Sequence, residues 1–389
     1  MPILSHKIAL NPTKVQEQAF VKACGVARFA YNWALGEWNK QYEAGLKPSG
    51  NKLNKQFNAI KKEQFPWIYE SPKDANQRPF LNLQAAFNRF FKKKGQYPRF
   101  KKKGHKDSFY VANDQFWIKN KTLKLPLIGL VKMFEELRFK GKIMSGVVSR
   151  TANRWFISIS VELEAPPKQV NPSTKTIGLD LGLKTTIVGS DGQEYQAPRP
   201  LKKYTKLLKR RSRQHSRKVK GSNNRKKSQA KLAKLHARIA NIRKDWTHKV
   251  TLKLIDENQV IGLENLNVQG MMANHKSAKA ISDVSWSEIR RQLEYKAVLY
   301  GREVKFVDRF YPSSKTCSKC GSIKEKLGLN ERTFVCLECG FAADRDLNAA
   351  INIENTVGVT GINAWGPATL VKNRVEPRNG SLFKQQVLV

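Results

Sequence analysis

The stretch Thr176-Ile-Gly-Leu-Asp-Leu-Gly-Leu-Lys-Thr-Thr-Ile-Val-Gly189 sets the architecture of the second half of this chain. Its first apolar run predicts a buried strand that ends near Asp180, and the glycine beyond it predicts a turn into a returning strand. A basic helical stretch over about 201–255 precedes a second apolar run at Gln259–Glu264. A helix follows, and then another strand over Glu303–Phe310. Because strands alternate with helices, this half is predicted to be an α/β domain.

Three carboxylates occupy positions from which they could meet. Asp180 and Glu264 close apolar strands, and Asp346 begins a helical pattern. A pair of Mg²⁺ ions that hydrolyses phosphodiester bonds needs such a cluster of hard oxygen ligands. RNase H-like nucleases place an Asp on one strand, an acidic residue on the neighbouring strand and a third on a helix. Taken singly, each could instead be a surface or capping carboxylate, as a helix N-terminus favours for Asp346. Asp180, inside an apolar strand, needs a charge partner or a metal.

The charge of the chain indicates a polyanionic partner. Lys and Arg number 72 against 31 Asp and Glu in 389 residues, a formal net charge of +41. Nucleic acid is the expected polyanion, because phosphate contacts release counterions. An anionic membrane surface is the rival, weakened by the spread of basic residues through several segments. We expect no signal peptide and no bilayer-spanning stretch, and hence a soluble cytoplasmic protein that is nucleoid-associated when bound to DNA.

Four of the five cysteines form two Cys-x-x-Cys pairs, Cys317/Cys320 and Cys336/Cys339. Two such turns present four thiolates to one tetrahedral Zn²⁺. A four-thiolate site leaves no open position for water, so the zinc is expected to be structural. A thioredoxin-like redox pair is the alternative, but it explains only one of the two pairs.

The first half of the chain predicts a different organisation. Residues 1–10 predict a short strand, and Asn11 followed by Pro12 predicts the start of a helix with the asparagine as N-cap. Helical patterning then runs to about Phe91. From about 108 to 170 the pattern changes to strands, which predict a small antiparallel barrel or sheet.

Two basic segments are candidate nucleic-acid contacts. In Phe90–Lys103, aromatic residues alternate with cations, an arrangement that can grip phosphates and stack on bases; the rings could equally anchor the loop to the core. Over 201–250, many cations accompany one acidic residue, and so dense a charge of one sign repels itself without a polyanion. A solvated charged helix is the alternative. The candidate contacts are Lys92, Lys93, Arg99, Lys101, Lys102, Arg210, Arg211, Arg213 and Arg217.

Together, these motifs resemble the TnpB (OrfB) family of transposon-encoded RNA-guided nucleases, which is related to type V CRISPR effectors. The resemblance is carried by Ile177-Gly-Leu-Asp-Leu-Gly182, Val260-Ile-Gly-Leu-Glu-Asn-Leu266, Tyr311-Pro-Ser-Ser-Lys-Thr-Cys-Ser-Lys-Cys-Gly321 and Asp344-Arg-Asp-Leu-Asn-Ala-Ala-Ile-Asn-Ile353. It implies that Asp180, Glu264 and Asp346 are catalytic and hold two Mg²⁺ ions. It also implies a guide RNA from the protein's own element and double-stranded target DNA beside a short adjacent motif. We expect a monomer and no membrane partner.

The resemblance further implies an α+β multidomain fold. Residues 1–10 and 108–170 would form a wedge-like β-barrel, interrupted by a helical recognition lobe over 11–107. Residues 171–312 and 342–356 would form an RNase H-like (RuvC) α/β nuclease domain, with a four-cysteine zinc finger inserted at 313–341. The tail over 357–389 lacks periodicity and is expected to be poorly ordered.

Three alternatives stay open. A catalytically silent RNA-guided DNA-binding repressor would share this ancestry, although the complete set of carboxylates argues against it. A basic zinc-containing RNA-binding protein accounts for the charge and the cysteines, but not for carboxylates at strand ends. A transposase that itself joins DNA strands fits a mobile element, for which that name is expected, but the motifs support only the cutting chemistry.

Overall fold

The computed structural model describes residues 2–164, 170, 172–328, 330–358 and 387–388. They fall into two compact units, unit 1 with Met1–Pro167 and Phe383–Val389, and unit 2 with Lys168–Leu382. The predicted mixed α/β, multidomain character is confirmed. The tail predicted to be poorly ordered lies outside the described residues, apart from 357–358 at the end of a helix and 387–388 in a short strand. None of the helices in the described ranges combines the length and apolar character needed to cross a bilayer.

Unit 1 is built on one sheet, in the order β2-β6-β7-β1-β5-β4-β3, with β15 parallel to β1. The long pairing of β1 with β7, from Ile3 opposite Glu162 to Leu10 opposite Trp155, is antiparallel and places the first residues of the chain in the middle of the sheet. The strands are β1 (Ile3–Asn11), β2 (Ser108–Ala112), β3 (Trp117–Lys119), β4 (Thr122–Leu125), β5 (Gly129–Met133), β6 (Gly141–Thr151), β7 (Arg154–Leu163) and β15 (Val387–Leu388).

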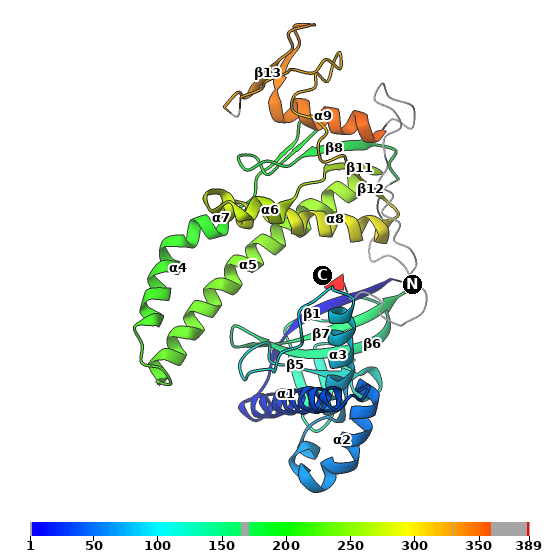
Figure 1. Ribbon diagram of the computed structural model, residues 1–389, viewed down its shortest axis with the longest axis vertical. Coiled ribbons are helices and arrows are strands. Elements are labelled where there is room, and N and C mark those ends of the chain that lie inside the picture. Colours follow the sequence, from blue (N-terminus) through cyan, green and yellow to red (C-terminus); the bar gives the residue numbers. More distant parts are fainter. Residues whose placement is uncertain (1, 165–169, 171, 329, 359–386, 389) are drawn as a thin grey trace. The chain divides into compact units, whose positions relative to one another are not determined.

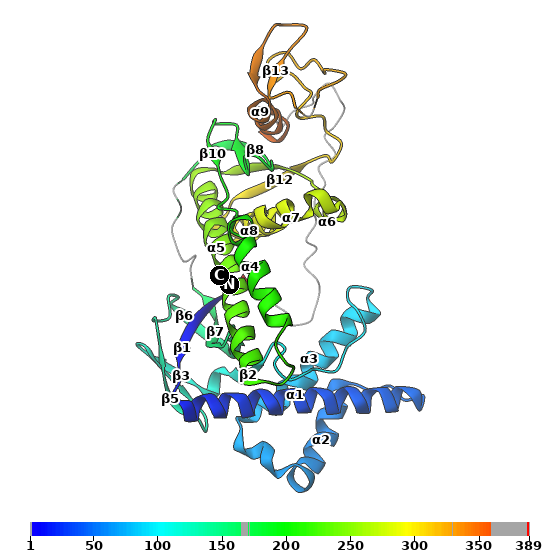
Figure 2. The same ribbon diagram turned by 90° about the vertical axis from the view of Figure 1, so that its left-hand side faces the viewer.

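This sheet is open, so the predicted barrel is wrong. Its outer strands, β2 and β3, do not pair with each other in the described residues. β3 has only three residues, and β2 packs against helices α1 and α3. The ring of Phe20 in α1 lies 5.0 Å from that of Trp155 and 5.9 Å from that of Phe109 in β2. Helices therefore cover apolar surface that closure of a barrel would have buried (Figure 2).

The helices of unit 1 are α1 (Lys14–Glu43), α2 (Gly50–Gln64) and α3 (Lys73–Phe91), with 3₁₀ turns η1 (Pro66–Glu70) and η2 (Asn113–Gln115). Helix α1 begins at Lys14 rather than Pro12, because Thr13 and not Asn11 is its N-cap. The Thr13 hydroxyl accepts a hydrogen bond from the Gln16 backbone N–H at 3.3 Å, and the Thr13 N–H donates to Gln16 Oε1 at 3.0 Å. This reciprocal capping box satisfies two helix-end donors that Asn11, still paired in β1, cannot reach.

Unit 2 is built on a five-stranded sheet in the order β10-β9-β8-β11-β12. Strands β8, β11 and β12 are parallel, and β9 returns antiparallel to β8. The strands are β8 (Thr176–Asp180), β9 (Ile187–Gly189), β10 (Glu194–Tyr195), β11 (Val260–Glu264) and β12 (Glu303–Val307). The strands predicted from the apolar runs are thus confirmed.

Helices cover both faces of this second sheet (Figure 1). Leu254 of α5 and Ile289 of α8 pack with Leu263 on one face, while Ile353 of α9 packs with Val307 on the other. The basic stretch forms two antiparallel helices, α4 and α5, joined at 217–222. The helices are α4 (Pro200–Ser216), α5 (Asn223–Glu257), α6 (Val268–Ala273), α7 (His275–Val284), α8 (Trp286–Tyr300) and α9 (Arg345–Gly358).

The cysteine-rich insert lies between β12 and α9. Its two strands, β13 (Thr333–Val335) and β14 (Ala342–Asp344), form an antiparallel hairpin. Each Cys-x-x-Cys turn is followed by a glycine with positive φ, +78° at Gly321 and +67° at Gly340. A side chain would be strained in this left-handed conformation, whereas glycine adopts it freely.

Candidate active site and metal centre

Asp180 and Glu264 are the last residues of two neighbouring parallel strands, so they lie together at the carboxyl ends of those strands. Leu179 of β8 lies opposite Leu263 of β11, and each carboxylate is the next residue on its strand. Parallel strands in this register present paired residues on the same face. The two carboxylates therefore leave the same face of the sheet.

Helix α9 lies against that face because two strand residues lack a side chain. A Cβ at Gly178 would lie 2.1 Å from the Ala350 carbonyl oxygen, and a Cβ at Gly262 would lie 2.7 Å from Val357 Cγ2. Asp346 is four residues before Ala350, so both lie on one side of the helix. This packing carries Asp346 toward Asp180, which lies two residues beyond Gly178 on the same face of β8.

The charges of Glu264 and Asp346 act on the carboxyl group of Asp180. Burial raises the pKa of Asp180 well above its ordinary value, and the charges of Glu264 and Asp346 raise it further, with Arg345 opposing them. The Asp180 side chain is nine-tenths buried, and no hydrogen bond or ion pair within the described residues reaches its carboxylate. An unpaired buried carboxylate of this kind is costly unless a proton or a cation neutralises it.

The segment before the first cysteine pair is tied to the carboxylates. Burial raises the pKa of Glu264, and a hydrogen bond from Ser313 Oγ to Glu264 Oε1, at 2.9 Å, opposes that rise. Asn352 Nδ2 of α9 donates to the carbonyl oxygens of Ser313 at 2.9 Å and Thr316 at 2.6 Å. Asn348, also buried in α9, donates to the same Thr316 oxygen at 2.7 Å. Ser313 therefore links Glu264 to α9.

The start of α9 holds Asp346 in place. Asp344 Oδ1 accepts hydrogen bonds from the backbone N–H groups of Asp346 at 2.9 Å and Leu347 at 3.1 Å. Asp346 Oδ2 in turn lies 3.7 Å from Arg332 Nη1. Asp344 is therefore a helix cap that orients its neighbour. Ser313 lies in the motif quoted from Tyr311 to Gly321, but sequence patterns assigned no role to it or to Arg332, because their positions depend on the course of the cysteine-rich insert.

The four predicted cysteines converge. Cys317 Sγ lies 3.7 Å from Cys339 Sγ, and Cys320 Sγ lies 3.6 Å from Cys336 Sγ. All four sulfur atoms lie within 4.8 Å of one another. A hydrogen bond with the Ser322 hydroxyl lowers the pKa of Cys320 and lowers that of Cys336 to about 6. A backbone hydrogen bond with Phe341 lowers the pKa of Cys339, but burial and hydrogen bonds with the other cysteines raise it to about 12 overall. The four gathered sulfur atoms fit one tetrahedral metal such as zinc, whose binding deprotonates the thiols.

Within the described ranges, the cysteines are the only Cys, His, Asp and Glu cluster already gathered to hold an ion. Asp180, Glu264 and Asp346 are not gathered as closely as the cysteines.

The basic candidates fall in both units. Lys92, Lys93 and Arg99 are exposed in unit 1, and Lys101 Nζ lies 4.0 Å from the centre of the Tyr31 ring. Of the remaining candidates, Lys102 is exposed in unit 1 and Arg210, Arg211, Arg213 and Arg217 belong to α4 or its C-terminal end. Of the aromatic residues in the first segment, Phe91 and Phe100 are 57% and 56% exposed. Phe91 nevertheless stacks on the buried ring of Phe87, 5.9 Å away, which ties it to the core, whereas Phe100 makes no ring contact among the described residues and remains free to stack.

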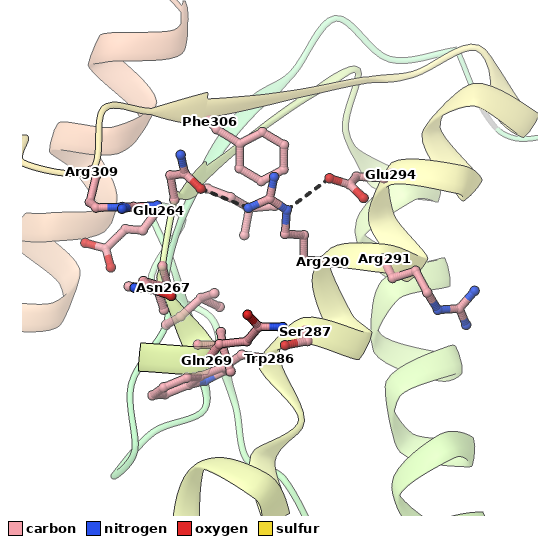
Figure 3. Close-up of a pocket in the computed structure, with 15 residues that line it drawn as sticks. Glu264, Asn267, Gln269, Trp286, Ser287, Arg290, Arg291, Glu294, Phe306 and Arg309 are labelled. Atoms are coloured by element: carbon pink, nitrogen blue, oxygen red, sulfur yellow. Dashed lines mark hydrogen bonds and ion pairs between the residues drawn. The ribbon is translucent and has the colours of Figure 1, made fainter. Parts of the chain in front are cut away.

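A pocket of about 300 Å³ adjoins Glu264, and sequence patterns did not indicate it. Glu264 lines it together with residues from α6, α8 and the end of β12 (Figure 3). Arg290 forms part of the wall, donating to Asn265 Oδ1 at 2.9 Å and Glu294 Oε1 at 3.0 Å, with its guanidinium 4.0 Å from the centre of the Phe306 ring. These residues are far apart in the chain and share no motif.

Comparison with protein-family models gives three matches. Residues 158–275 match a family described as "Probable transposase", residues 286–353 match "Cas12f1-like, TNB domain", and residues 1–47 match "Helix-turn-helix domain". The second match spans α8, β12, the cysteine-rich insert and most of α9.

Several curated proteins match nearly the whole chain, and two of them illustrate the match. A Streptomyces pristinaespiralis protein named "Putative RNA-guided DNA endonuclease" is 35% identical over 362 residues, covering 90% of this chain and 88% of its own length. The Escherichia coli K12 protein named "Putative RNA-guided DNA endonuclease InsQ" is 33% identical over 367 residues, covering 90% and 91%.

Among solved structures, the chain is similar to that in a Cas12f1–sgRNA–target DNA complex. The TM-score is 0.53 at 15% identity, over 86% of this chain and 82% of the other. At this identity the likeness concerns the fold alone. The level of identity to the curated relatives, over nearly their full length, settles the family. This chain is a member of the TnpB (OrfB) family.

Proposed function

We propose that this chain is an RNA-guided DNA endonuclease whose active site consists of Asp180, Glu264 and Asp346. The observation that carries the proposal is the approach of these three carboxylates from two neighbouring strand ends and a helix start. An aspartate on one strand, an acidic residue on the next and a third on a helix is the placement that RNase H-like nucleases use. It supports a RuvC-like domain built on the unit 2 sheet.

The residues fit a pair of Mg²⁺ ions. Asp180, Glu264 and Asp346 offer hard oxygen ligands, and the Asp180 carboxylate is buried without a partner in the described residues. When bound, such ions lower the pKa of an attacking water and stabilise the leaving oxygen. Ser313 positions Glu264 through its hydrogen bond. The Asp344 cap fixes the backbone that carries Asp346.

The partners follow from charge and from the relatives. A net charge of +41 suits two polyanions at once, a guide RNA and its DNA target. The two curated relatives are named as RNA-guided DNA endonucleases. In such a protein, base pairing with the guide RNA selects the DNA. The protein binds the nucleic-acid backbone and recognises a short motif beside the target. We assign the RNA to the protein's own element, the wedge and recognition roles to residues 1–170, and a monomeric state to the complex.

The four-cysteine centre is proposed to hold one structural zinc ion. Its sulfur atoms are already gathered, and four thiolates leave no coordination position for a substrate. Through Asn348 and Asn352, its first turn is fixed to α9, which carries Asp346. The zinc would thereby stabilise the active site without taking part in the chemistry.

The test starts from protein expressed with the DNA that flanks its gene, so that any bound RNA is purified with it. That RNA is sequenced, and matched DNA beside randomised bases is incubated with the complex in Mg²⁺ or in EDTA. We expect one defined RNA and cutting that requires Mg²⁺. Asp180→Ala should retain the RNA and lose cutting, whereas Asp245→Ala, which removes an exposed carboxylate of α5, should cut normally.

Two results would contradict the proposal in different ways. Undiminished cutting by Asp180→Ala would place the active site elsewhere. Tight binding of matched DNA without any cutting by the unaltered protein would identify a repressor instead.

A further inference from the structure

Two asparagines of α1 hold the basic loop over 96–107 in a fixed conformation. Asn32 pairs with both backbone groups of Lys101: its Oδ1 accepts from the Lys101 N–H at 2.7 Å, and its Nδ2 donates to the Lys101 carbonyl oxygen at 3.0 Å. Nearer the start of the loop, the Tyr97 hydroxyl donates to Asn39 Oδ1 at 2.7 Å. One side chain thus satisfies the backbone of the loop at its middle, as a neighbouring strand would.

A third contact from the same helix holds the end of the loop. Arg28 Nη1 lies 3.2 Å from Asp107 Oδ1, and both side chains are mostly buried. Asn32 and Asn39 follow Arg28 by four and eleven residues, which is about one and three turns of an α-helix. The three residues therefore form one stripe along α1, and the loop runs along that stripe. Its conformation is set by the fold before any ligand arrives.

The loop turns its cations and one ring outward. Arg99, Phe100, Lys102 and Lys103 are exposed, and Phe100 is 56% exposed without a ring contact in the described part of the chain. No acidic residue occurs over 92–106. An exposed aromatic ring among cations, on backbone that is already ordered, is suited to a nucleic acid, because phosphates neutralise the cations and a base can stack on the ring.

A single ring limits the kind of contact. Proteins that bind a single strand along its bases offer successive rings, one for each base. Here Phe91 is tied to Phe87, so that Phe100 is the ring left for stacking in this loop within the described residues. One apolar side chain on a fixed element is what proteins use as a wedge at a single base step of a duplex. The loop therefore fits a duplex at a step where stacking is broken.

We propose that this loop is a wedge that stacks Phe100 on the target DNA at the point where its two strands separate. Arg99, Lys102 and Lys103 contact the phosphates beside that point. Asn32 is a positioning residue, which holds the loop without touching the DNA. The inference rests on the proposed function and adds to it the element that helps to open the duplex.

Target DNA is favoured over the guide RNA because the DNA is the duplex that must be opened. RNA–DNA pairs are about as stable as the DNA pairs they replace, so the first broken step limits how readily the exchange begins. A ring that replaces the lost stacking lowers the cost of that step. A fixed loop also loses little conformational entropy on contact, which is why the asparagine clamp matters.

The experiment measures the opening of DNA directly, so that its result does not depend on cutting. The full protein with its co-purified RNA, in the Asp180→Ala background and in Mg²⁺, is mixed with matched duplex DNA. A fluorescent adenine analogue several pairs into the target reports when its base unstacks. A second duplex has mismatches at the first few target pairs beside the adjacent motif, so that its strands are already apart there.

The variants separate a wedge from a general contact. Phe100→Ala should slow the opening of fully paired DNA about tenfold and leave the pre-opened duplex unaffected, because only the paired DNA needs a stacking partner. Phe100→Tyr should restore most of the rate. Asn32→Ala should slow opening of paired DNA about threefold, since the freed loop must be ordered on contact. Phe134→Ala removes another phenylalanine of unit 1, 65% exposed and outside the loop, and should behave as the parent protein.

Four outcomes would overturn the inference. They are opening of paired DNA by Phe100→Ala at the parent rate, equal slowing on paired and pre-opened DNA, no opening of matched DNA by the parent protein, and loss of the co-purified RNA from Phe100→Ala. The last result would assign the ring to the guide. Failure of the proposed function looks different: the protein with Asp180 intact opens matched DNA and does not cut it, while the effect of Phe100→Ala on opening persists.

Discussion

Substitution of Gly178 by alanine should separate α9 from the sheet. A Cβ at this position would lie 2.1 Å from the Ala350 carbonyl oxygen and 2.4 Å from the Glu354 backbone nitrogen. Both are backbone atoms of one helix, so no side-chain rotation relieves the overlap. Restoring an ordinary contact requires α9 to shift by roughly 1 Å, at a cost of about 1–3 kcal/mol in the free energy of unfolding.

That shift moves Asp346 away from Asp180 and Glu264. A displacement of about 1 Å at a reacting group lowers a catalytic rate by about 100-fold. We therefore expect Gly178→Ala to lower the single-turnover rate of Mg²⁺-dependent cutting by about two orders of magnitude. Binding of RNA and of matched DNA should change far less, because neither depends on the position of Asp346.

Two further glycine substitutions calibrate the effect. In Gly262→Ala the nearest atom is Val357 Cγ2, at 2.7 Å, which belongs to a side chain that can move. Its losses in thermal stability and rate should be smaller. Gly36→Ala, within α1, meets no atom within 4 Å and should stabilise unit 1 by about 1 kcal/mol. Cutting by Gly178→Ala at the wild-type rate would refute the idea that the contact of α9 with β8 positions Asp346.

Four other outcomes are expected. Burial and neighbouring carboxylates raise the pKa of Asp180, so the folded protein holds a proton that the unfolded chain releases. In EDTA, the melting temperature of the wild type should therefore fall as the pH rises above the ordinary aspartate pKa range. The melting temperature of Asp180→Asn should fall less. Mg²⁺ should raise the melting temperature of wild type but not of that variant, as differential scanning fluorimetry can measure. Metal analysis should find about one zinc per chain in the wild type and none in Cys317→Ser. The cutting rate of Cys317→Ser should also fall, because the cysteine-rich insert supports α9. Asn348→Ala breaks a buried hydrogen bond to Thr316 and should destabilise unit 2 by about 1–3 kcal/mol in thermal or denaturant unfolding; an unchanged melting temperature would mean that this tie is dispensable.

Local pattern was sufficient to predict the central elements of unit 2. The apolar runs that end at Asp180 and Glu264 are unambiguous strands, because each is short, β-branched or leucine-rich, and bounded by turns. The cysteine spacing likewise predicts its own convergence, since each pair is set by one tight turn. Asp180 and Glu264 share one face of the sheet because of the strand register. Gly178 and Gly262 constrain that register, but this becomes apparent only once α9 is placed against the strands.

Other features depend on contacts that no local pattern records. The strand pattern left both a barrel and an open sheet possible, and the resemblance implied the barrel, but whether the outer strands meet depends on tertiary contacts such as the packing of α1 and α3 on β2. The contact of Ser313 with Glu264 joins residues 49 positions apart, and the pocket around Trp286 gathers residues from four elements. The N-cap at Thr13 was missed because Asn11 and Thr13 are both good caps, and strand pairing of Asn11 decides between them.

The hydrogen bonds from Asn348 and Asn352 to the chain just before Cys317 also limit where the cysteine-rich insert can be re-engineered. Exchange of the loop between the two Cys-x-x-Cys pairs for a foreign module is compatible with the catalytic core only if the junctions leave this clamp intact. One splice point belongs beyond Ser318, whose N–H is held by Asn348, and the other before Arg332. A graft that removes residues of this clamp would separate α9 from the unit 2 sheet, even if the new module folds on its own.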